Sequence, residues 1–265
     1  MADFSNVKRI LIKIGSALVT KDNRFNNALV REKANEIAQL AKQGKEIVIV
    51  SSGAVALGME IEKLDERPAD TLKLQLLSGK GQVKLVSRYA DFFSEYGIEV
   101  SQVLLTHLNF RNKGQMETIR NILEGYINDR DIPIINENDC VAKDEFVSDG
   151  DNAFSDNDGL AALVALLIKA DAMLVLTNVD GLYDQDPLKH SDAKLISDVK
   201  SVTKEIEEAS KFGVSRLGLG GMHSKVIAAR KVTDKGIDMI VGNGKHSILD
   251  ILEGKADCTV FYRKR

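Results

Sequence analysis

Residues Lys45–Ala54 read KEIVIVSSGA, a short β-branched run that ends in two serines and a glycine. Continuous apolar runs of this length are typical of strands buried on both faces of a parallel sheet. A helical pattern precedes the run over Ala28–Gln43, and Gly44 follows as its predicted C-cap. Another helix is expected from Ala54 onward. Because the strand has a helix on each side, this stretch predicts an α/β fold with a mostly parallel sheet.

The same alternation of strand and helix extends over the rest of the chain. Further strands are predicted at Arg9–Ile14, Ile98–Leu105, Ile132–Ile135, Ala172–Thr177, Asp238–Val241 and Thr259–Phe261. Further helices are predicted at Val83–Tyr96, Gln115–Asp129, Asn157–Lys169, Ser201–Lys211 and Met222–Lys235. Pro133 places its strand near an edge of the sheet. Three segments lack both patterns and are expected where open α/β sheets bind ligands: Asn136–Asp156, Asn178–Ser191 and Phe212–Gly221.

The composition restricts the class of protein. The chain has 265 residues, of which 44% are hydrophobic and 28% charged, as in soluble globular proteins with a sizeable core. Its formal net charge of −3 argues against binding to nucleic acid. The two cysteines form no CxxC motif and the four histidines show no metal-ligand spacing, so we expect reduced thiols and no metal site. No signal peptide or membrane span is predicted, so we expect a cytoplasmic protein.

Two segments have the chemistry for binding phosphate. Lys13 lies near the end of a buried strand, just before Gly15 and Ser16, and a lysine there is costly unless its ammonium reaches an anion. Leu219–Lys225 reads LGGMHSK and leads into a helix, whose first backbone N–H groups and dipole favour phosphate. Neither a Walker A motif nor GxGxxG is present. Taken singly, each segment has an ordinary alternative, a solvated lysine or a glycine-rich connector.

Polar residues follow two of the predicted strands. Asn136–Asp139 reads NEND and Asp149–Asp158 reads DGDNAFSDND, a composition suited to a small polar ligand. Calcium is a competing interpretation, but the EF-hand spacing is not matched, and a solvated loop is a third. Thr177–Tyr183 reads TNVDGLY, a turn with an aromatic ring that could hold a nucleobase.

In chain order, the segments KIGS, SSGA, INEND, DNDGLAA, LTNVDGLY and GGMHSK resemble the amino acid kinase family, over Lys8–Phe261. The resemblance implies a three-layer αβα sandwich in a single domain, residues 1–265. It also implies phosphorylation of the γ-carboxylate of free L-glutamate by ATP, with Mg²⁺ carried on the ATP phosphates. This reaction would begin proline biosynthesis. The same resemblance leads us to expect a homo-oligomer with L-proline as an inhibitor. The charge balance and the lack of a predicted membrane span lead us to expect no nucleic-acid or membrane partner.

The resemblance assigns roles to individual residues. Lys13 and Lys225 are expected on the transferring phosphoryl group, with Asp158 holding both lysines in place. The expected substrate-binding residues are Ser52, Gly53, Asn136, Asp139 and Asn157. The expected nucleotide-binding residues are Lys13, Gly15, Ser16, Thr177, Asn178, Leu219, Gly220, Gly221, Met222, His223, Ser224 and Lys225. His223 is interpreted as a loop residue rather than an acid, because an ionised γ-carboxylate needs no general base.

The sequence departs from the family pattern at three places. Ser155 replaces a usual glycine, the loop Val147–Phe154 is longer than usual, and no C-terminal PUA domain is expected, although many bacterial relatives carry one. The alternatives within the family are chiefly a kinase for N-acetylglutamate, with kinases for aspartate and uridylate further off. A non-catalytic amino-acid sensor is disfavoured because Lys13, Asp158 and Lys225 are all retained. A Rossmann dehydrogenase lacks its glycine fingerprint.

Overall fold

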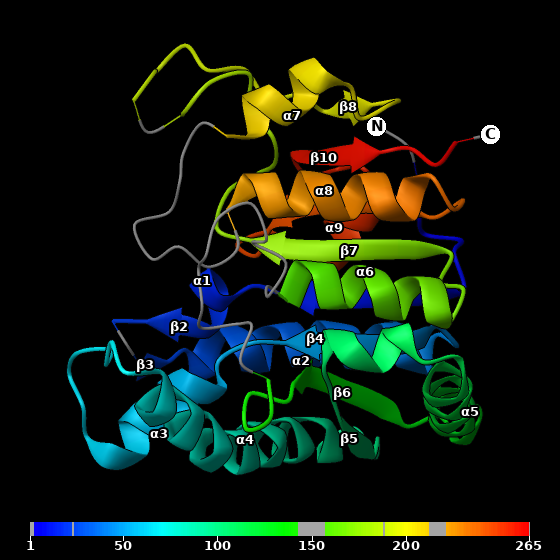
Figure 1. Ribbon diagram of the computed structural model, residues 1–265. Coiled ribbons are helices and arrows are strands. Elements are labelled where there is room, and N and C mark those ends of the chain that lie inside the picture. The colour runs from blue at the N-terminus through cyan, green and yellow to red at the C-terminus, as the bar shows by residue number, and fades with distance from the viewer. Residues whose placement is uncertain (1–2, 23, 143–156, 188, 212–220, 265) are drawn as a thin grey trace.

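The computed structural model describes residues 3–22, 24–142, 157–187, 189–211 and 221–264. Within them, an eight-stranded sheet has the order β5-β6-β4-β1-β7-β9-β10-β8 (Figure 1). Its strands are β1 (Arg9–Ile14), β4 (Glu46–Ser51), β5 (Val100–Leu105), β6 (Ile132–Glu137), β7 (Ala172–Thr177), β8 (Asp198–Val199), β9 (Asp238–Asn243) and β10 (Cys258–Phe261). Neighbours from β5 to β9 pair in parallel and only β10 pairs antiparallel to β9, so the predicted sheet is confirmed.

Helices cover both faces of this sheet. They are α1 (Ser16–Val19), α2 (Asn27–Lys42), α3 (Ala54–Glu62), α4 (Thr71–Ser94), the 3-10 helix η1 (His107–Arg111), α5 (Lys113–Asp129), α6 (Asn157–Leu167), α7 (Lys204–Ser210), α8 (Met222–Thr233) and α9 (Ile248–Leu252). In Figure 1, α6 and α8 lie in front of the sheet and α2 lies behind it. A small hairpin of β2 (Thr20–Lys21) and β3 (Arg24–Phe25) stands apart. The predicted three-layer sandwich is confirmed.

The alternation of side chains along β1 separates two buried clusters. Ile10 and Ile12 belong to the cluster under α2, whereas Leu11 belongs to the cluster under α6 and α8. Because successive side chains of a strand point to opposite faces, Lys13 lies on the same face as Leu11. The strand period therefore directs this lysine toward α6 and α8.

The helix α4 is longer than predicted. It begins at Thr71 rather than Val83, because the Asp70 side chain caps it by accepting from the backbone N–H of Lys73 at 2.7 Å. Glycines inside α4 obscure the helical pattern in the sequence. They serve close packing, since a Cβ on Gly81 would lie 1.8 Å from the carbonyl oxygen of Ala54 on α3.

The strand β6 also extends beyond its prediction. Asn136 and Glu137, which were expected to be irregular, are its last two residues and are buried. The strand is second from the edge, between β5 and β4. Ile132 donates to Glu99, on the β5 side, so Pro133 faces β4, where pairing begins only at Ile134. The proline therefore removes no ladder hydrogen bond.

Smaller differences concern the ends of elements. The helices α6, α7 and α8 are shorter than predicted, and α7 begins at Lys204 after the capping residue Thr203. The elements α1, η1, α9, β8 and the β2–β3 hairpin were not predicted. No helix in the described ranges combines the length and the apolar character that a membrane crossing requires.

Candidate active site

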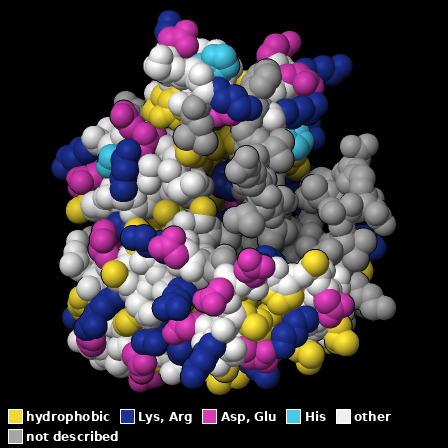
Figure 2. Space-filling view, turned by 90° about the vertical axis from the view of Figure 1, so that its left-hand side faces the viewer, with side chains coloured by type: hydrophobic (Ala, Val, Ile, Leu, Met, Phe, Trp, Pro, Cys, Tyr) yellow, Lys and Arg dark blue, Asp and Glu magenta, His cyan; other side chains and the backbone are white. Residues whose placement is uncertain are grey.

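The carboxyl ends of four neighbouring parallel strands meet at one edge of the sheet. There β1 leads into Gly15, β4 into Ser52, β6 toward Asp139, and β7 ends at Thr177. This is the edge at which open α/β sheets bind ligands. Figure 2 looks onto it and shows acidic and basic side chains interspersed over the described surface.

A buried ion cluster lies where α6 and α8 begin. Asp158 is fully buried, and its Oδ1 lies 2.6 Å from Nζ of Lys13. Its Oδ2 lies 3.0 Å from Nζ of Lys225 and also accepts a hydrogen bond of 2.9 Å from Oγ of Ser224. Lys13 and Lys225 are only 4% and 3% exposed. The structure thus brings together the three residues that the sequence singled out for phosphoryl transfer.

The electrostatics of the ion cluster favour an ionised carboxylate. Burial alone would raise the pKa of Asp158, but the ammonium groups of Lys13 and Lys225 outweigh it and hold that pKa well below its usual range. Two buried ammonium groups converge on this one carboxylate. Such an arrangement suits an anionic ligand.

Two glycines, Gly15 and Gly53, lie at turns along this edge of the sheet. The N–H of Gly15 donates to the carbonyl oxygen of Leu176 at 3.0 Å, and a Cβ on Gly15 would lie 2.9 Å from the same oxygen. Ser16, the next residue, is exposed. Gly53 has φ +108° before α3, a conformation that favours glycine. A Cβ there would also lie 3.0 Å from Val19.

An amide network joins the predicted substrate residues to α4. Nδ2 of Asn157 donates to Oγ of Ser52 at 2.8 Å and to Oδ1 of Asn136 at 3.2 Å. Nδ2 of Asn136 donates in turn to Oε1 of Gln82 on α4, at 2.8 Å. The structure thus links four elements, β4, α6, β6 and α4, through one set of side chains.

Asp139 is likewise held by α4. Its Oδ2 accepts a hydrogen bond from Oγ of Ser78, and its backbone carbonyl accepts one of 2.9 Å from Nε2 of Gln75. Sequence reasoning did not identify Gln75, Ser78 and Gln82. A signal was present, because polar residues spaced by three and four along α4 mark one face of a helix.

The residues predicted to bind the nucleotide are found in two places. Thr177 is the last residue of β7 and Asn178 follows it, and the carbonyl of Thr177 accepts from the N–H of Gly244 at 2.8 Å. Gly221, Met222, His223, Ser224 and Lys225 lie at the start of α8. The interpretation of His223 as a loop residue conflicts with the helix predicted from Met222 onward, and the structure confirms the helix: His223 lies in the first turn of α8 with Nδ1 2.9 Å from Oγ of Ser210. Leu219, Gly220, Ser155 and the loop Val147–Phe154 lie outside the described residues.

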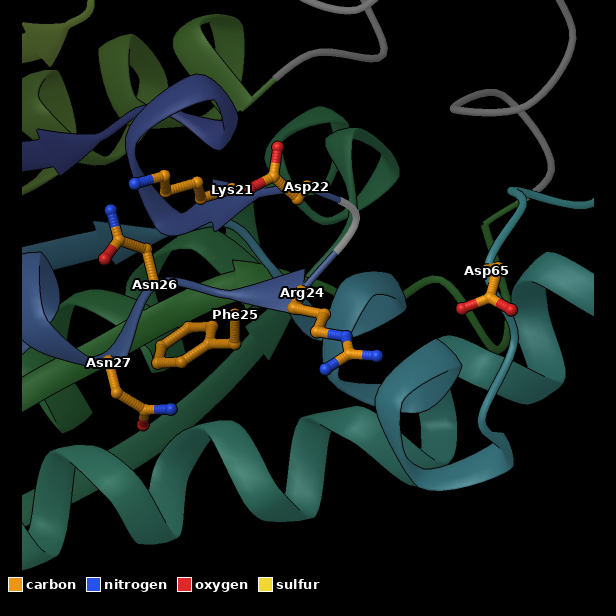
Figure 3. A pocket seen from close by; sticks show the side chains of 7 residues that line it. All are labelled: Lys21, Asp22, Arg24, Phe25, Asn26, Asn27 and Asp65. Atoms are coloured by element: carbon orange, nitrogen blue, oxygen red, sulfur yellow. The ribbon is translucent and has the colours of Figure 1, made fainter.

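A cavity of about 570 Å³ lies beside this edge, at the β2–β3 hairpin. Figure 3 shows its lining residues: Lys21, Asp22, Arg24, Phe25, Asn26, Asn27 and Asp65. Phe25 lines this cavity and also lies next to Gly53 of the site, because a Cβ added to Gly53 would lie 3.3 Å from the Phe25 ring. The cavity shares no residue with the ion cluster or the amide network. Nowhere in the described ranges do three His, Cys, Asp or Glu side chains gather in a group that could hold a metal ion.

The sequence model of the amino acid kinase family matches residues 8–243. The chain belongs to the amino acid kinase family. Similar members include a glutamate 5-kinase from Streptococcus uberis, 40% identical over 99% of this chain and 98% of its own. A glutamate 5-kinase from Clostridium perfringens is 37% identical over 97% of this chain and 96% of its own.

Solved structures show the same amino acid kinase fold at low sequence identity. Carbamate kinase from Giardia lamblia, bound to AMP-PNP, matches with a TM-score of 0.68 and 16% identity, over 98% of this chain and 100% of that one. UMP kinase from Ureaplasma parvum matches with a TM-score of 0.63 and 17% identity, over 97% and 100% of the two chains. The fold is therefore shared by kinases with different names and does not by itself define the substrate.

Proposed function

We propose that this amino acid kinase is a glutamate 5-kinase, acting through residues 1–265 as one kinase domain. It transfers the γ-phosphoryl group of ATP to the γ-carboxylate of L-glutamate, which opens proline biosynthesis. The observation that carries the proposal is the buried ion cluster of Lys13, Asp158 and Lys225 beside an amide network that includes Asn136 and Asn157. The near-full-length similarity of the chain to glutamate 5-kinases supports glutamate as the substrate.

The chemistry requires positive charge rather than a base. A γ-carboxylate with a pKa of about 4.3 is already ionised near neutral pH. Its oxygen attacks the γ-phosphorus, the bond from that phosphorus to the bridging oxygen breaks, and ADP leaves with the electron pair. Phosphoryl transfer is chiefly a matter of positioning and electrostatic stabilisation. Lys13 and Lys225 supply charge to the transferring group, and Asp158 keeps their ammonium groups together.

The amide network and Asp139 bind the amino acid. Asp139 receives the α-ammonium of glutamate in a charge-assisted hydrogen bond, because its buried Oδ1 has no partner among the described residues. Asn136, Asn157 and Ser52 line the rest of the amino-acid site. The turn at Gly53 brings the backbone close to the bound glutamate. A site of this kind prefers free glutamate to N-acetylglutamate, whose neutral amide would leave Asp139 unpaired.

ATP binds across the first turn of α8, with Gly15, Ser16, Thr177 and Asn178 beside it and Gly221–Lys225 at the phosphates. The N-terminus of α8 adds its dipole to the charge of Lys225. Bound ATP would carry Mg²⁺ on its phosphates, and the ion would offset phosphate charge beside Lys13 and Lys225. The enzyme acts in the cytoplasm, where both substrates are available.

The proposal extends to assembly and regulation. A homo-oligomer is supported by exposed apolar side chains on α3 and α4, at Ile61, Leu72, Leu76 and Val83. L-Proline competes with glutamate, because it also presents one ammonium and one carboxylate to Asp139 and the amide network. Light scattering tests the first statement. Calorimetry with proline in the presence of saturating glutamate tests the second.

The direct test is ADP formation from ATP and Mg²⁺ with each candidate acid, with hydroxylamine added to trap an acyl phosphate as its hydroxamate. We expect ADP and hydroxamate in equal amounts with L-glutamate and little of either with N-acetylglutamate. ADP that does not depend on glutamate would contradict the proposal. Glutamate binding without any ADP formation would favour the sensor instead.

A further inference from the structure

Three buried polar atoms around the amino-acid end of the site have no hydrogen-bond partner among the described residues. They are Nε2 of Gln82, Oδ1 of Asp139 and Oδ1 of Asn157. Gln82 and Asp139 are each only 6% exposed. Leaving such an atom unpaired costs roughly 1–3 kcal/mol, so three of them in one place point to a ligand that completes them.

Two backbone groups fix which atoms of the amide network are left over. The N–H of Glu137 can only donate, and it donates to Oδ1 of Asn136 at 2.9 Å. Nδ2 of Asn136 is therefore the donor toward Gln82, and Gln82 must present Oε1 to it. The unpaired atom of Gln82 is thus a donor.

The same reasoning applies to Asn157. The carbonyl oxygen of Ser51 can only accept, and it lies 3.3 Å from Nδ2 of Asn157, which leaves the acceptor Oδ1 unpaired. The unpaired set is then one amide donor, one amide acceptor and one carboxylate oxygen. An α-amino acid has the complementary groups, a carboxylate that accepts and an ammonium that donates.

The position of Gln82 selects between the two carboxylates of the proposed substrate. The γ-carboxylate must face Lys13 and Lys225 for transfer. Among the described residues, Gln82 is joined to that end through Asn136 and then Asn157, the residue before Asp158. It therefore lies at the other end of the hydrogen-bonded chain, where the α-carboxylate belongs.

We propose that Gln82 is a substrate-binding residue, which donates a hydrogen bond from Nε2 to the α-carboxylate of glutamate. This inference rests on the proposed function and adds a specificity-determining residue from α4. The residue is held firmly, because Gly81 beside it packs against Ala54 of α3 with no room for a side chain.

The test compares three variants and two ligands. Gln82→Glu keeps an acceptor for Asn136 but replaces the free donor by an oxygen, whereas Gln82→Met removes both groups. Gln75→Met is the matched control, because Gln75 is on the same helix and its Nε2 is already satisfied by the carbonyls of Asp139 and Ala142, at 2.9 and 3.0 Å. The ligands are L-glutamate and 4-aminobutanoate, which differs only in lacking the α-carboxylate.

The readout is the ratio of the two ligand affinities, measured as the KM of glutamate and the inhibition constant of 4-aminobutanoate. In Gln82→Met we expect the KM of glutamate to rise roughly 10- to 150-fold, as for a lost hydrogen bond to a charged group. The inhibition constant of 4-aminobutanoate and the KM of ATP should change little, so the preference for glutamate over 4-aminobutanoate decreases. Gln82→Glu should decrease this preference at least as much. In Gln75→Met both ligands should weaken together, because both present the ammonium that Asp139 receives.

A wild-type ratio in both Gln82 variants, with unchanged thermal unfolding, would overturn the assignment and leave Gln82 as a purely structural partner of Asn136. That result would leave the proposed function intact as long as the wild-type enzyme forms ADP with glutamate. A wild-type enzyme without glutamate-dependent ADP would instead refute the proposed function.

Discussion

The ion cluster and the amide network lie at the same edge of the sheet and are built differently. In the ion cluster, both oxygens of Asp158 contact an ammonium group, so its geometry is set before any ligand arrives. In the amide network and at Asp139, buried atoms remain without partners among the described residues. A preset charge arrangement stabilises a transition state, whereas unsatisfied polar atoms select the ligand that satisfies them. We therefore expect the ion cluster to control rate and the amino-acid end to control selectivity.

The largest expected effect is on substrate selectivity. The wild-type kcat/KM should favour L-glutamate over N-acetylglutamate by up to about 10⁴, because a polar site rejects an analogue that leaves its groups unpaired. Asp139→Asn should lose most of this preference, since it removes the charge that the α-ammonium meets. Steady-state kinetics with both acids provide the measurement. Equal rates on the two acids in the wild type would refute the role of Asp139.

The next effect is on stability, and it concerns the ion cluster. Asp158→Ala should lower the free energy of unfolding at pH 7 by about 3–5 kcal/mol, because it leaves Lys13 and Lys225 buried without their carboxylate. Urea unfolding of the ligand-free protein measures this difference. If Asp158→Ala lowers the free energy of unfolding no more than an ordinary surface substitution does, the ion cluster is hydrated.

The pH dependence of that difference has a definite sign. The folded-state pKa of Asp158 is lowered, so its contribution is present above the unfolded-state value of 3.8 and is lost as pH falls below it. The gap between wild type and Asp158→Ala should be constant from neutral pH to about pH 5 and shrink below about pH 4. A gap that shrinks already between pH 7 and pH 5 would contradict the lowered pKa.

A smaller effect separates rate from binding. Lys225→Met should lower kcat by roughly 10²–10³, by analogy with the loss of one transition-state donor, and leave the KM of glutamate nearly unchanged. Lys235→Met is the control, since Lys235 is exposed just beyond α8. Near-normal turnover in Lys225→Met would assign this lysine a structural role only.

The smallest expected effect is at α4. Ser78→Ala removes the hydroxyl that donates to Asp139 and should raise the KM of glutamate roughly 10-fold with little change in kcat. Ser87→Ala, on the exposed face of the same helix, should leave both constants unchanged. A change in kcat alone would show that Ser78 acts on the transfer step rather than on Asp139.

These two regions also differ in how far the sequence predicts them. The two lysines could be singled out as phosphate-binding candidates, because Lys13 stands in a strongly apolar strand and Lys225 follows tandem glycines before a helix. Only the resemblance to the amino acid kinase family joined them to Asp158. The strand period then places Lys13 on the face that α6 and α8 cover. For Lys13, the face predicted by the local strand pattern is therefore the face on which the lysine makes its tertiary contact.

The amide network could be predicted only in part. Asn136 and Asp139 were expected from their place after a strand, but Gln82 meets Asn136 across 54 residues of sequence, and no local pattern shows such a contact. The glycines of α4 hid the half of the helix that carries Gln75 and Ser78. Asn136 and Glu137 were assigned to a loop because both residue types are disfavoured in strands, a preference that burial between β4 and β5 overrides.

The division between rate and selectivity is tested most directly by single-turnover phosphoryl transfer from labelled ATP, measured over a range of glutamate concentrations in Lys225→Met and Asp139→Asn. We predict that Lys225→Met lowers the plateau rate and leaves the half-saturating glutamate concentration unchanged. Asp139→Asn should raise the half-saturating concentration and leave the plateau nearly unchanged. If each variant shifts both quantities to a similar extent, the ion cluster and the amino-acid end do not act separately.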